Sequence, residues 1–322
     1  MAKSEQSKIE ARNEKEYEKQ QRKKKKPLTL GDIIFNICNY GVFTIFTISC
    51  IFPFYYIFIN TISKRSDVVA GRITLYPKGI NIQNYIDILK VNDIFDAFAV
   101  SITRTILGTA LMVLATGLIG YLVTKQEMWH RKLWYRFIVI TMYFNAGIIP
   151  WYMNMSMLGL TGSFAAYIIP GIVAPYNIIL VKTYIESIPA ELEESAFMDG
   201  AGFLTVFWKI IWPLSKPILA TIAIFGAVGH WNSFTDSLIL MQEEPKLFTL
   251  QHLLYNYLNQ GSNIEGIMNT GGTAAAGILE DMLNAKVIKY TVSMVSIIPI
   301  LLVYPFMQRY FEKGIMLGAV KG

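Results

Sequence analysis

The segment ELEESAFMDGAG (191–202) gathers carboxylates, small residues and an Asp-Gly pair between two long apolar stretches. Carboxylates can act as general acids or bases, or as metal ligands, often together with histidine or cysteine. The chain contains no HExxH, CxxC or GxSxG pattern, and His130, His230 and His252 fall in different segments. The sequence therefore predicts neither a catalytic residue nor a metal site.

Two other features that could carry chemistry give weaker signals. Residues 271–277 read GGTAAAG, which is rich in glycine but lacks the Gly-Lys-Ser/Thr ending of a phosphate loop. Cys38 and Cys50 lie on or beside one predicted helix, roughly 18 Å apart along it, which is too far for a disulfide bond. We expect no cofactor bound by this chain itself, and we interpret both cysteines as packing residues.

The carboxylate segment is predicted to begin with a short helix. Ser187 and Pro189 are typical of a helix start. The acidic residues Glu191, Glu193 and Glu194 follow, where the positive end of the helix dipole favours anions. Ser195 and Ala196 keep one side of this helix thin, which permits close approach of another surface.

An Asp199-Gly200 turn then separates this helix from a second one, with Gly200 suited to a left-handed cap. The second helix carries an apolar stripe at helical spacing, formed by Phe203, Phe207, Ile210 and Leu214. Pro213 and Pro217 close it at the foot of the next apolar run. The segment could lie on a membrane surface as a simple anchor, or it could contact another protein. Spacing alone leaves both interpretations open.

The rest of the chain has the composition of a membrane protein. Hydrophobic residues make up 53% and charged residues 16%, whereas soluble domains carry about 25% charged residues. Six runs are apolar and long enough to cross about 30 Å of hydrocarbon. They are approximately 41–60, 105–124, 134–153, 163–181, 217–241 and 287–306. We predict an all-α polytopic membrane protein with six transmembrane helices.

Lysine and arginine near the ends of these runs predict the topology. Residues 1–31 form a charged tail that contains RKKKK (22–26). A basic tail before an apolar run suits the anionic surface of membrane lipid on the cytoplasmic side better than it suits nucleic acid. Both termini and residues 125–133 and 182–216 are then cytoplasmic, and 242–286 faces outside. The outer segment 62–97 opposes this assignment mildly, since it holds five basic residues.

The carboxylate segment resembles the EAA loop of ABC-importer permeases. In that loop Glu-Ala-Ala is followed after three residues by Gly, and after nine more by Ile-x-Leu-Pro. The matching residues here are Glu194-Ser195-Ala196, Asp199-Gly200 and Ile210-Ile211-Trp212-Pro213. The chain departs from the pattern at Ser195, which stands for alanine, and at Trp212, which stands for leucine. The glutamate, Asp-Gly and proline positions match at full spacing.

Residues 32–322 also resemble the MalG-like permeases of carbohydrate importers. The resemblance rests on Asn84-Tyr85, Trp231-Asn232-Ser233-Phe234, Phe248-Thr249-Leu250 and the terminal Gly318-Ala319-Val320-Lys321-Gly322. Ser233 replaces the aspartate of the family's Trp-Asn-Asp-Phe. The stretch FNAGIIPWY (144–152) is similar to the branch that handles polysaccharide-derived oligosaccharides. The tail 1–31 lies outside the resemblance.

The resemblance implies a permease subunit that imports oligosaccharide across the bacterial cytoplasmic (inner) membrane and is not itself an enzyme. A second permease completes the path, two cytoplasmic ATPase subunits bind and hydrolyse ATP, and an extracellular sugar-binding protein delivers the solute. The loop 186–216 then joins an ATPase subunit, and 242–286 is the extracellular loop. The implied coupling residues are Glu191, Glu194, Ser195, Ala196, Asp199, Gly200, Ala201, Phe203, Phe207 and Pro213.

Polar and aromatic residues inside the apolar runs are candidates for the sugar path, because unpaired polar groups are costly there. We select Asn145, Asn177, Trp231, Asn232 and Asp236, with His230 and Ser233 beside them. Tryptophan faces pack against the C–H surfaces of sugars, and asparagine both donates and accepts hydrogen bonds. The same side chains could instead bond helices to one another.

Two alternative functions share part of this pattern. A secondary transporter would show an internal repeat of broken helices and coupling-ion carboxylates within the spans, and Asp236 alone does not meet that expectation. An ABC permease for another solute class would share the loop 186–216 but not the Trp-Asn and C-terminal matches.

Overall fold

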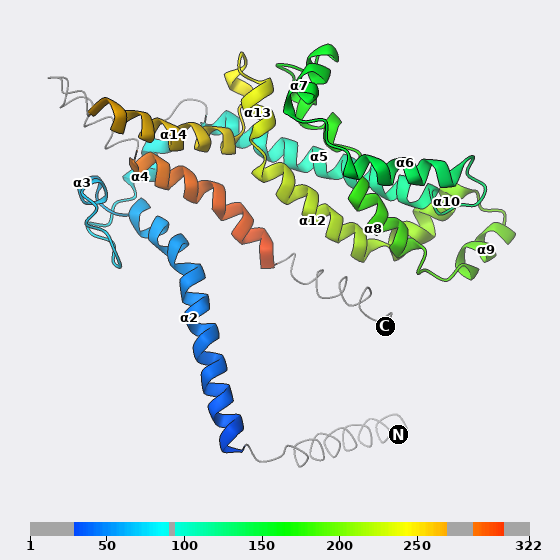
Figure 1. The fold of residues 1–322 in the computed structure, drawn as a ribbon, viewed down its shortest axis with the longest axis horizontal. Helices are drawn as coiled ribbons and strands as arrows, with labels where there is room; N and C mark the ends of the chain where they lie inside the picture. The colour runs from blue at the N-terminus through cyan, green and yellow to red at the C-terminus, as the bar shows by residue number, and fades with distance from the viewer. Residues whose placement is uncertain (1–28, 90–93, 269–285, 306–322) are drawn as a thin grey trace, which may run out of the picture. The chain divides into compact units, whose positions relative to one another are not determined.

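The computed structural model describes residues 29–89, 94–268 and 286–305, and all regular secondary structure in these ranges is helical (Figure 1). The predicted all-α class is confirmed. Packing within the chain separates two units, Met1–Tyr56 and Ile57–Gly322, which we describe in turn. Most of the tail 1–31 and the terminal motif 318–322 lie outside the described residues.

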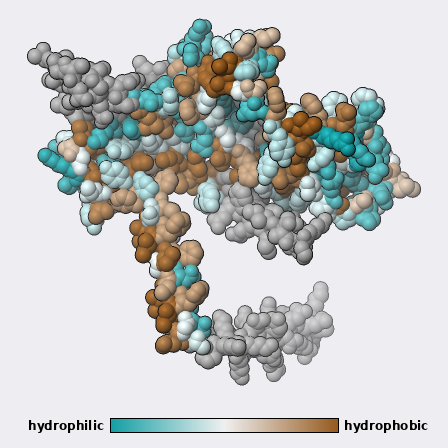
Figure 2. Space-filling view, in the orientation of Figure 1, coloured by the Kyte–Doolittle hydropathy of each residue, from teal (hydrophilic) through white to brown (hydrophobic). Residues whose placement is uncertain are grey.

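Helix α2 (Leu30–Thr61) supplies the described part of the first unit. Thr29 and Asp32 start it: the Thr29 hydroxyl donates to the Asp32 carboxylate at 2.7 Å, and the Asp32 N–H donates back to Thr29 Oγ1 at 3.3 Å. The helix contains the predicted run 41–60, and its apolar side chains are exposed along most of its length (Figure 2). A helix that is apolar on all sides suits lipid tails as its surroundings.

The second unit is built on α5 (Ile94–Leu122), against which α12 (Lys216–Asn232) and α8 (Pro175–Ile185) pack (Figure 1). Small residues let these helices approach closely. A Cβ added at Gly226 of α12 would lie 2.6 Å from Met112 Cε of α5. A Cβ at Gly120 of α5 would lie 2.8 Å from Val181 Cγ1 of α8. The three-helix core of this unit therefore depends on glycine at its contact points.

Other helices complete the second unit. They are α3 (Arg65–Val69), α4 (Gln83–Leu89), α6 (Arg131–Tyr143), α7 (Ile148–Met157), η1 (Phe164–Tyr167), η2 (Ile169–Gly171), α9 (Glu191–Met198), α10 (Phe203–Val206), η3 (Phe207–Ile211), α11 (Trp212–Leu214), α13 (Thr235–Leu240), η4 (Pro245–Leu247) and α14 (Leu250–Met268). A further helix spans Lys286–Pro305. In the predicted extracellular loop 242–286, η4 and α14 are described, and 269–285 lie outside the described residues.

The Asn84-Tyr85 pair closes the connection that follows α2. The buried Asn84 amide donates to the carbonyl oxygens of Thr61 and Ser63 at 2.8 and 3.1 Å. The Tyr85 hydroxyl bonds the Thr61 hydroxyl at 2.8 Å. Asn84 therefore satisfies carbonyls at and just after the end of α2, which have no helical partners.

Three of the described helices are long and apolar enough to cross a membrane: α2, α5 and Lys286–Pro305. Two bent pairs pass the same test together. The first joins Phe164–Gly171 to Pro175–Ile185 with a bend of 44°, and the second joins Phe203–Leu214 to Lys216–Asn232 with a bend of 80°. The described ranges thus hold three to five candidate spans, and the count of six stays a prediction.

Three predicted runs are not continuous helices. Run 163–181 divides into η1, η2 and α8. Run 134–153 divides into α6 and α7, because Gly147 adopts φ +89° and its N–H donates to Asn145 Oδ1 at 2.9 Å. Run 217–241 divides into α12 and α13, because Ser233 is extended and its carbonyl bonds Arg104 instead of continuing the helix. Hydropathy detects apolar stretches, but it does not detect breaks whose freed backbone groups are paired locally.

Candidate functional site

Gly200 sets the direction of the chain between α9 and α10. It adopts φ +79°, and its N–H and that of Ala201 donate to Phe197 O and Ala196 O, both at 3.0 Å. These bonds close the end of α9 in the manner of a left-handed cap. A Cβ at position 200 meets nothing within 4 Å, so only the backbone conformation demands glycine. The predicted left-handed turn is confirmed.

Glu193 fastens α9 to the end of α5. Its carboxylate accepts hydrogen bonds from Lys125 Nζ and, at 3.3 Å, from the Tyr121 hydroxyl. The Lys125 and Glu193 side chains are only 15% and 13% exposed. Lys125 also lies 4.4 Å from the centre of the Tyr121 ring. Sequence reasoning placed Glu193 in the first helical turn but did not predict this ion pair, which joins segments that are far apart in the chain.

The predicted coupling residues are mostly on the surface of this segment. Exposed are Glu191, Glu194, Ser195, Asp199, Gly200, Phe203 and Pro213. Ala196 and Ala201 are half-buried. Phe207 is 2% exposed and packs against the Tyr121 ring at 5.4 Å, so its part is to hold the segment on α5.

A π-turn changes which residues of the second helix are buried. The chain runs from α10 through the π-helical η3 into α11, and Val206, Phe207 and Ile211 are buried. The predicted stripe is therefore wrong: Phe203 and Leu214 are each 43% exposed. A π-turn holds more residues than an α-turn, so positions after it are rotated relative to a regular helix.

Trp212, where the resembling motif has leucine, fits against a glycine of α5. A Cβ at Gly117 would approach the Trp212 ring to 2.8 Å. Trp212 also contacts the rings of Phe207 and Trp208, with centroids 5.6 and 5.0 Å away. The departure from the pattern is accommodated by the absence of a side chain at position 117.

A cavity of about 320 Å³ lies in the second unit, farther along α5 and α12 from the coupling segment. Its polar and aromatic lining is Arg104, Trp151, Tyr167, His230, Ser233 and Asp236. Arg104 is 2% exposed and donates to Asp236 Oδ2 at 2.5 Å and to Ser233 O at 3.2 Å. Its guanidinium carbon stands 4.4 Å from the centre of the Tyr167 ring. The arginine is thus paired and held over an aromatic face.

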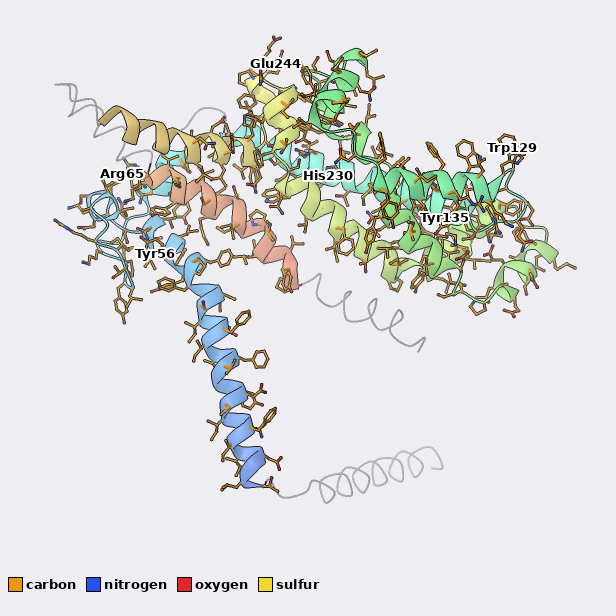
Figure 3. The ribbon with its side chains drawn as sticks, in the orientation of Figure 1. Tyr56, Arg65, Trp129, Tyr135, His230 and Glu244 are labelled. Carbon is orange, nitrogen blue, oxygen red and sulfur yellow. The ribbon has the colours of Figure 1, made fainter. Side chains whose placement is uncertain are left out.

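The imidazole of His230 occupies a slot formed by two glycines. A Cβ at Gly108 of α5 would lie 2.5 Å from His230 Nε2, and one at Gly171 of η2 would lie 3.3 Å from His230 Cε1. Figure 3 shows His230 on α12 beside α5. The ring fits beside the cavity because neither glycine carries a side chain.

The predicted path residues separate into different environments. Asp236 lines the cavity. Trp231 and Asn177 are buried in helix contacts, Trp231 Nε1 donating to Ser296 O at 3.0 Å and Asn177 Nδ2 to Met112 Sδ at 3.4 Å. Asn145 and Asn232 are exposed, outside the lining of this cavity. Trp231 and Asn177 therefore bond helices to one another, as the alternative interpretation expects, and do not line this cavity.

Sequence reasoning missed Arg104, Trp151 and Tyr167. The predicted run began at 105, after the arginine, whereas α5 begins at Ile94 and places Arg104 well inside a candidate span. A charged residue followed by a long apolar run is the signal that could have identified Arg104. Its partner Asp236 lies on a different helix, and sequence spacing does not predict that contact.

A buried polar network continues from the cavity to the start of α14. The Tyr167 hydroxyl donates to Ser237 Oγ at 2.9 Å, and Ser237 Oγ bonds His252 Nδ1 at 2.9 Å. The Leu250 N–H donates to Ser101 Oγ of α5 at 2.8 Å. Burial lowers the pKa of His252, and the nearby Asp236 carboxylate opposes that shift. Within the described ranges, no three His, Cys, Asp or Glu side chains gather to hold a metal ion.

Comparison with known proteins gives consistent matches over most of the chain. Residues 27–317 match the family model described as "Binding-protein-dependent transport system inner membrane component". The "Polygalacturonan/rhamnogalacturonan transport system permease protein YtcP" of Bacillus subtilis (strain 168) is 32% identical over 289 residues, covering 90% of this chain and 99% of that protein. "Protein LplC" of the same organism is 33% identical over 297 residues, covering 90% and 95%.

A solved structure agrees with these sequence matches. One chain of a bacterial ABC transporter involved in the import of the acidic polysaccharide alginate superposes with a TM-score of 0.77 and 32% sequence identity, covering 89% of this chain and 99% of that one. The resemblance drawn from the sequence is confirmed. The chain belongs to the family of binding-protein-dependent transport system inner membrane components.

Proposed function

We propose that this chain is the permease subunit of an ATP-driven ABC importer that carries oligosaccharides across the cytoplasmic membrane. It works with a second permease, two cytoplasmic ATPase subunits and an extracellular sugar-binding protein. The family membership supports the transport role, and the names of the relatives, which include polygalacturonan and rhamnogalacturonan transport, support carbohydrate as the solute class. ATP is bound and hydrolysed by the partner subunits, and this chain catalyses no reaction of its own.

The observation that carries the proposal is the way α9 is mounted. The helix presents exposed Glu191, Glu194 and Ser195 outward, while Glu193 fastens its inner side to Lys125 at the end of α5. From Gly200 the chain continues through α10, η3 and α11 into α12, which lines the cavity. A force applied to α9 by an ATPase subunit thus reaches α5 and α12 through rigid, packed elements.

The cavity beside Arg104 is the proposed part of the sugar path on this subunit. Trp151 offers an aromatic face to sugar C–H groups, and His230 offers ring nitrogens to hydroxyls. Asp236 neutralises Arg104, so the pair adds little net charge to the lining. The other predicted path residues lie outside this cavity. We propose for them only a role in helix contacts or in a surface completed by the second permease; they are Asn145, Asn177, Trp231 and Asn232.

The topology belongs to the same proposal. Residues 186–216 and both termini lie in the cytoplasm, and 242–286 faces outward, where the sugar-binding protein docks. Exposed Glu243, Glu244 and Lys246 near η4 give the outer segment a polar surface, and Figure 3 labels Glu244 there. After η4 the Thr249 N–H donates to Ser237 Oγ at 3.2 Å, and Ser237 Oγ also bonds Tyr167 of the cavity lining.

Transport by the purified complex tests the function directly. The chain would be isolated with its co-eluting subunits, placed in vesicles, and supplied with binding protein and a panel of neutral and uronic-acid oligosaccharides. We expect at least one oligosaccharide to raise the ATPase rate and to enter the vesicles only when ATP is present. Uptake driven by an ion gradient without ATP would instead identify a secondary transporter. Stimulation only by an amino acid or phosphate would overturn the solute class.

A further inference from the structure

One half of a groove along the start of α6 is basic. The groove has a volume of about 940 Å³, and its cationic lining is Arg131, Lys132 and Arg136, with His130 beside them. The lining contains no carboxylate, and neither Lys132 nor Arg136 makes an ion pair within the described part of the chain. Lys132 and Arg136 are four residues apart on one helix, so their like charges repel. An anion between them relieves that repulsion and receives charge-assisted hydrogen bonds.

The other half of the same groove is apolar. Leu133, Phe137 and Ile140 line it, and they are 59%, 56% and 64% exposed. Their spacing of four and three residues places them along one face of α6. A free phosphate ion or an acidic peptide would use the cations and leave this apolar face unused. A molecule with an anionic head and a hydrocarbon tail matches both halves.

Contacts at both sides hold the groove in place. Arg131 Nη1 donates to Thr124 O at 2.8 Å, which fixes the start of α6 against the end of α5. Lys182 of α8 lies 4.6 Å from the centre of the Tyr135 ring. His130 adopts φ +50° and stacks on Trp129 at 4.2 Å, and Figure 3 shows Trp129 and Tyr135 at this part of the unit. The basic and apolar halves are therefore presented together by a preformed surface.

We propose that this groove binds an anionic phospholipid of the cytoplasmic leaflet, with the phosphate at Lys132 and Arg136 and an acyl chain along Phe137 and Ile140. Basic juxtamembrane residues on the cytoplasmic side of a membrane attract anionic lipid headgroups. Trp129 is 71% exposed, as suits a ring in the interfacial layer. The proposal depends on the membrane embedding and the topology given above, and it does not depend on which solute is carried.

Lipid retention by the intact complex tests the proposal. Wild type and a Lys132→Gln/Arg136→Gln variant would be assembled in bilayer discs of equal parts phosphatidylcholine and phosphatidylglycerol, and retained lipids would be counted by native mass spectrometry after release. Lys64→Gln/Lys78→Gln is the matched control, because it removes two exposed lysines that lie outside both the groove and the loop 186–216. We expect the groove variant to retain about one tenth as much phosphatidylglycerol as wild type, or less. Its retention of phosphatidylcholine should be unchanged, and the control variant should retain both lipids as wild type does.

Three results would overturn the proposal. Equal retention of phosphatidylglycerol by wild type and the groove variant would show that the lipid binds elsewhere. Displacement of phosphatidylglycerol from wild type by inorganic phosphate would make the groove a simple anion site. Loss of the second permease from the groove variant, with unchanged lipid retention by the rest, would show that a protein surface covers the groove. A Phe137→Ala variant separates the two halves: it should weaken phosphatidylglycerol retention while the complex stays assembled.

Discussion

Single residues compensate for the two positions at which the coupling segment departs from its family's pattern. Ser195 stands for alanine, and its hydroxyl donates to Glu191 O at 2.8 Å, so the polar atom is satisfied within α9. Trp212 stands for leucine, and the extra ring volume lies over Gly117. More than one combination of residues can therefore produce the packing that the EAA-loop pattern describes.

Valine at position 200 should impair coupling without harming membrane insertion. Gly200 has φ +79° and open space around it, so Gly200→Val acts through backbone strain, at a cost of about 1–3 kcal/mol. Gly202→Val is the matched control, since Gly202 also has open space but adopts φ −81°. We expect Gly200→Val to lose sugar uptake or ATPase co-purification and Gly202→Val to retain both. Equal transport by the two variants would mean that α9 is only an anchor.

A methyl group at position 108 should act through His230. Gly108→Ala places a Cβ 2.5 Å from His230 Nε2, and overpacking of this kind costs about 1–3 kcal/mol. We expect Gly108→Ala to lower the thermal unfolding midpoint of the complex and to weaken sugar-stimulated ATP hydrolysis. In the double variant with His230→Ala, the midpoint should recover, because the clashing ring is gone. A double variant as unstable as Gly108→Ala would assign the clash to another contact.

At the scale of elements, α9 depends on one partly buried ion pair for its position. Hydrogen bonds to charged groups contribute about 1.5–3 kcal/mol, so Glu193→Gln should raise the hydrogen-exchange rate of residues 191–199 by about tenfold or more. Glu194→Lys reverses a charge on the exposed side, so it should leave that protection unchanged and weaken the ATPase contact, most strongly at low salt. Unchanged exchange in Glu193→Gln would mean that the aromatic contacts of Phe197 and Phe207 suffice.

The junction of α13 and α14 should weaken in mild acid. Burial lowers the pKa of His252, so below the ordinary histidine pKa of about 6.5 the unfolded chain binds a proton that the folded chain does not. Stability of this junction is therefore expected to be constant above about pH 7 and to fall as the pH drops below about 6.5. Proteolysis or hydrogen exchange of 249–259 across this range measures it. His252→Gln should remove the pH dependence, and an identical acid response in that variant would refute the assignment.

For the whole molecule, the orientation in the membrane is the property that most needs measurement. In a background lacking Cys38 and Cys50, Gly202→Cys and Lys246→Cys place single exposed thiols on the two predicted sides. An impermeant maleimide applied to intact cells should label position 246 and leave 202 unlabelled until the membrane is opened. Strong labelling at 202 in intact cells would show that the topology is the reverse of the predicted one. It would also contradict the proposals for α9 and for the α6 groove, which depend on that topology.

Local physical rules were enough to predict much of the coupling segment. The acidic first turn, the small residues and the Asp-Gly turn depend on interactions within a few residues, and α9 with its left-handed Gly200 has the expected form. The stripe on the second helix was not predictable in the same way. Which residues of that helix face the core depends on the π-turn at 207–211. Contacts of Phe207 and Ile211 with α5, α8 and α12 hold this turn, rather than local sequence.

The sequence by itself determined that the chain is helical and built for a membrane, and its motifs identified the family, because hydropathy, helix period and motif spacing are properties of the chain order. The tertiary structure alone decided where those runs break and which polar groups meet. Arg104 and Asp236 lie on different helices, His230 fits in space left by glycines of two other elements, and Lys125 pairs with Glu193 across the fold. Such pairs form because an unpartnered polar group is costly in an apolar interior, and that cost acts through space, whatever the distance along the chain.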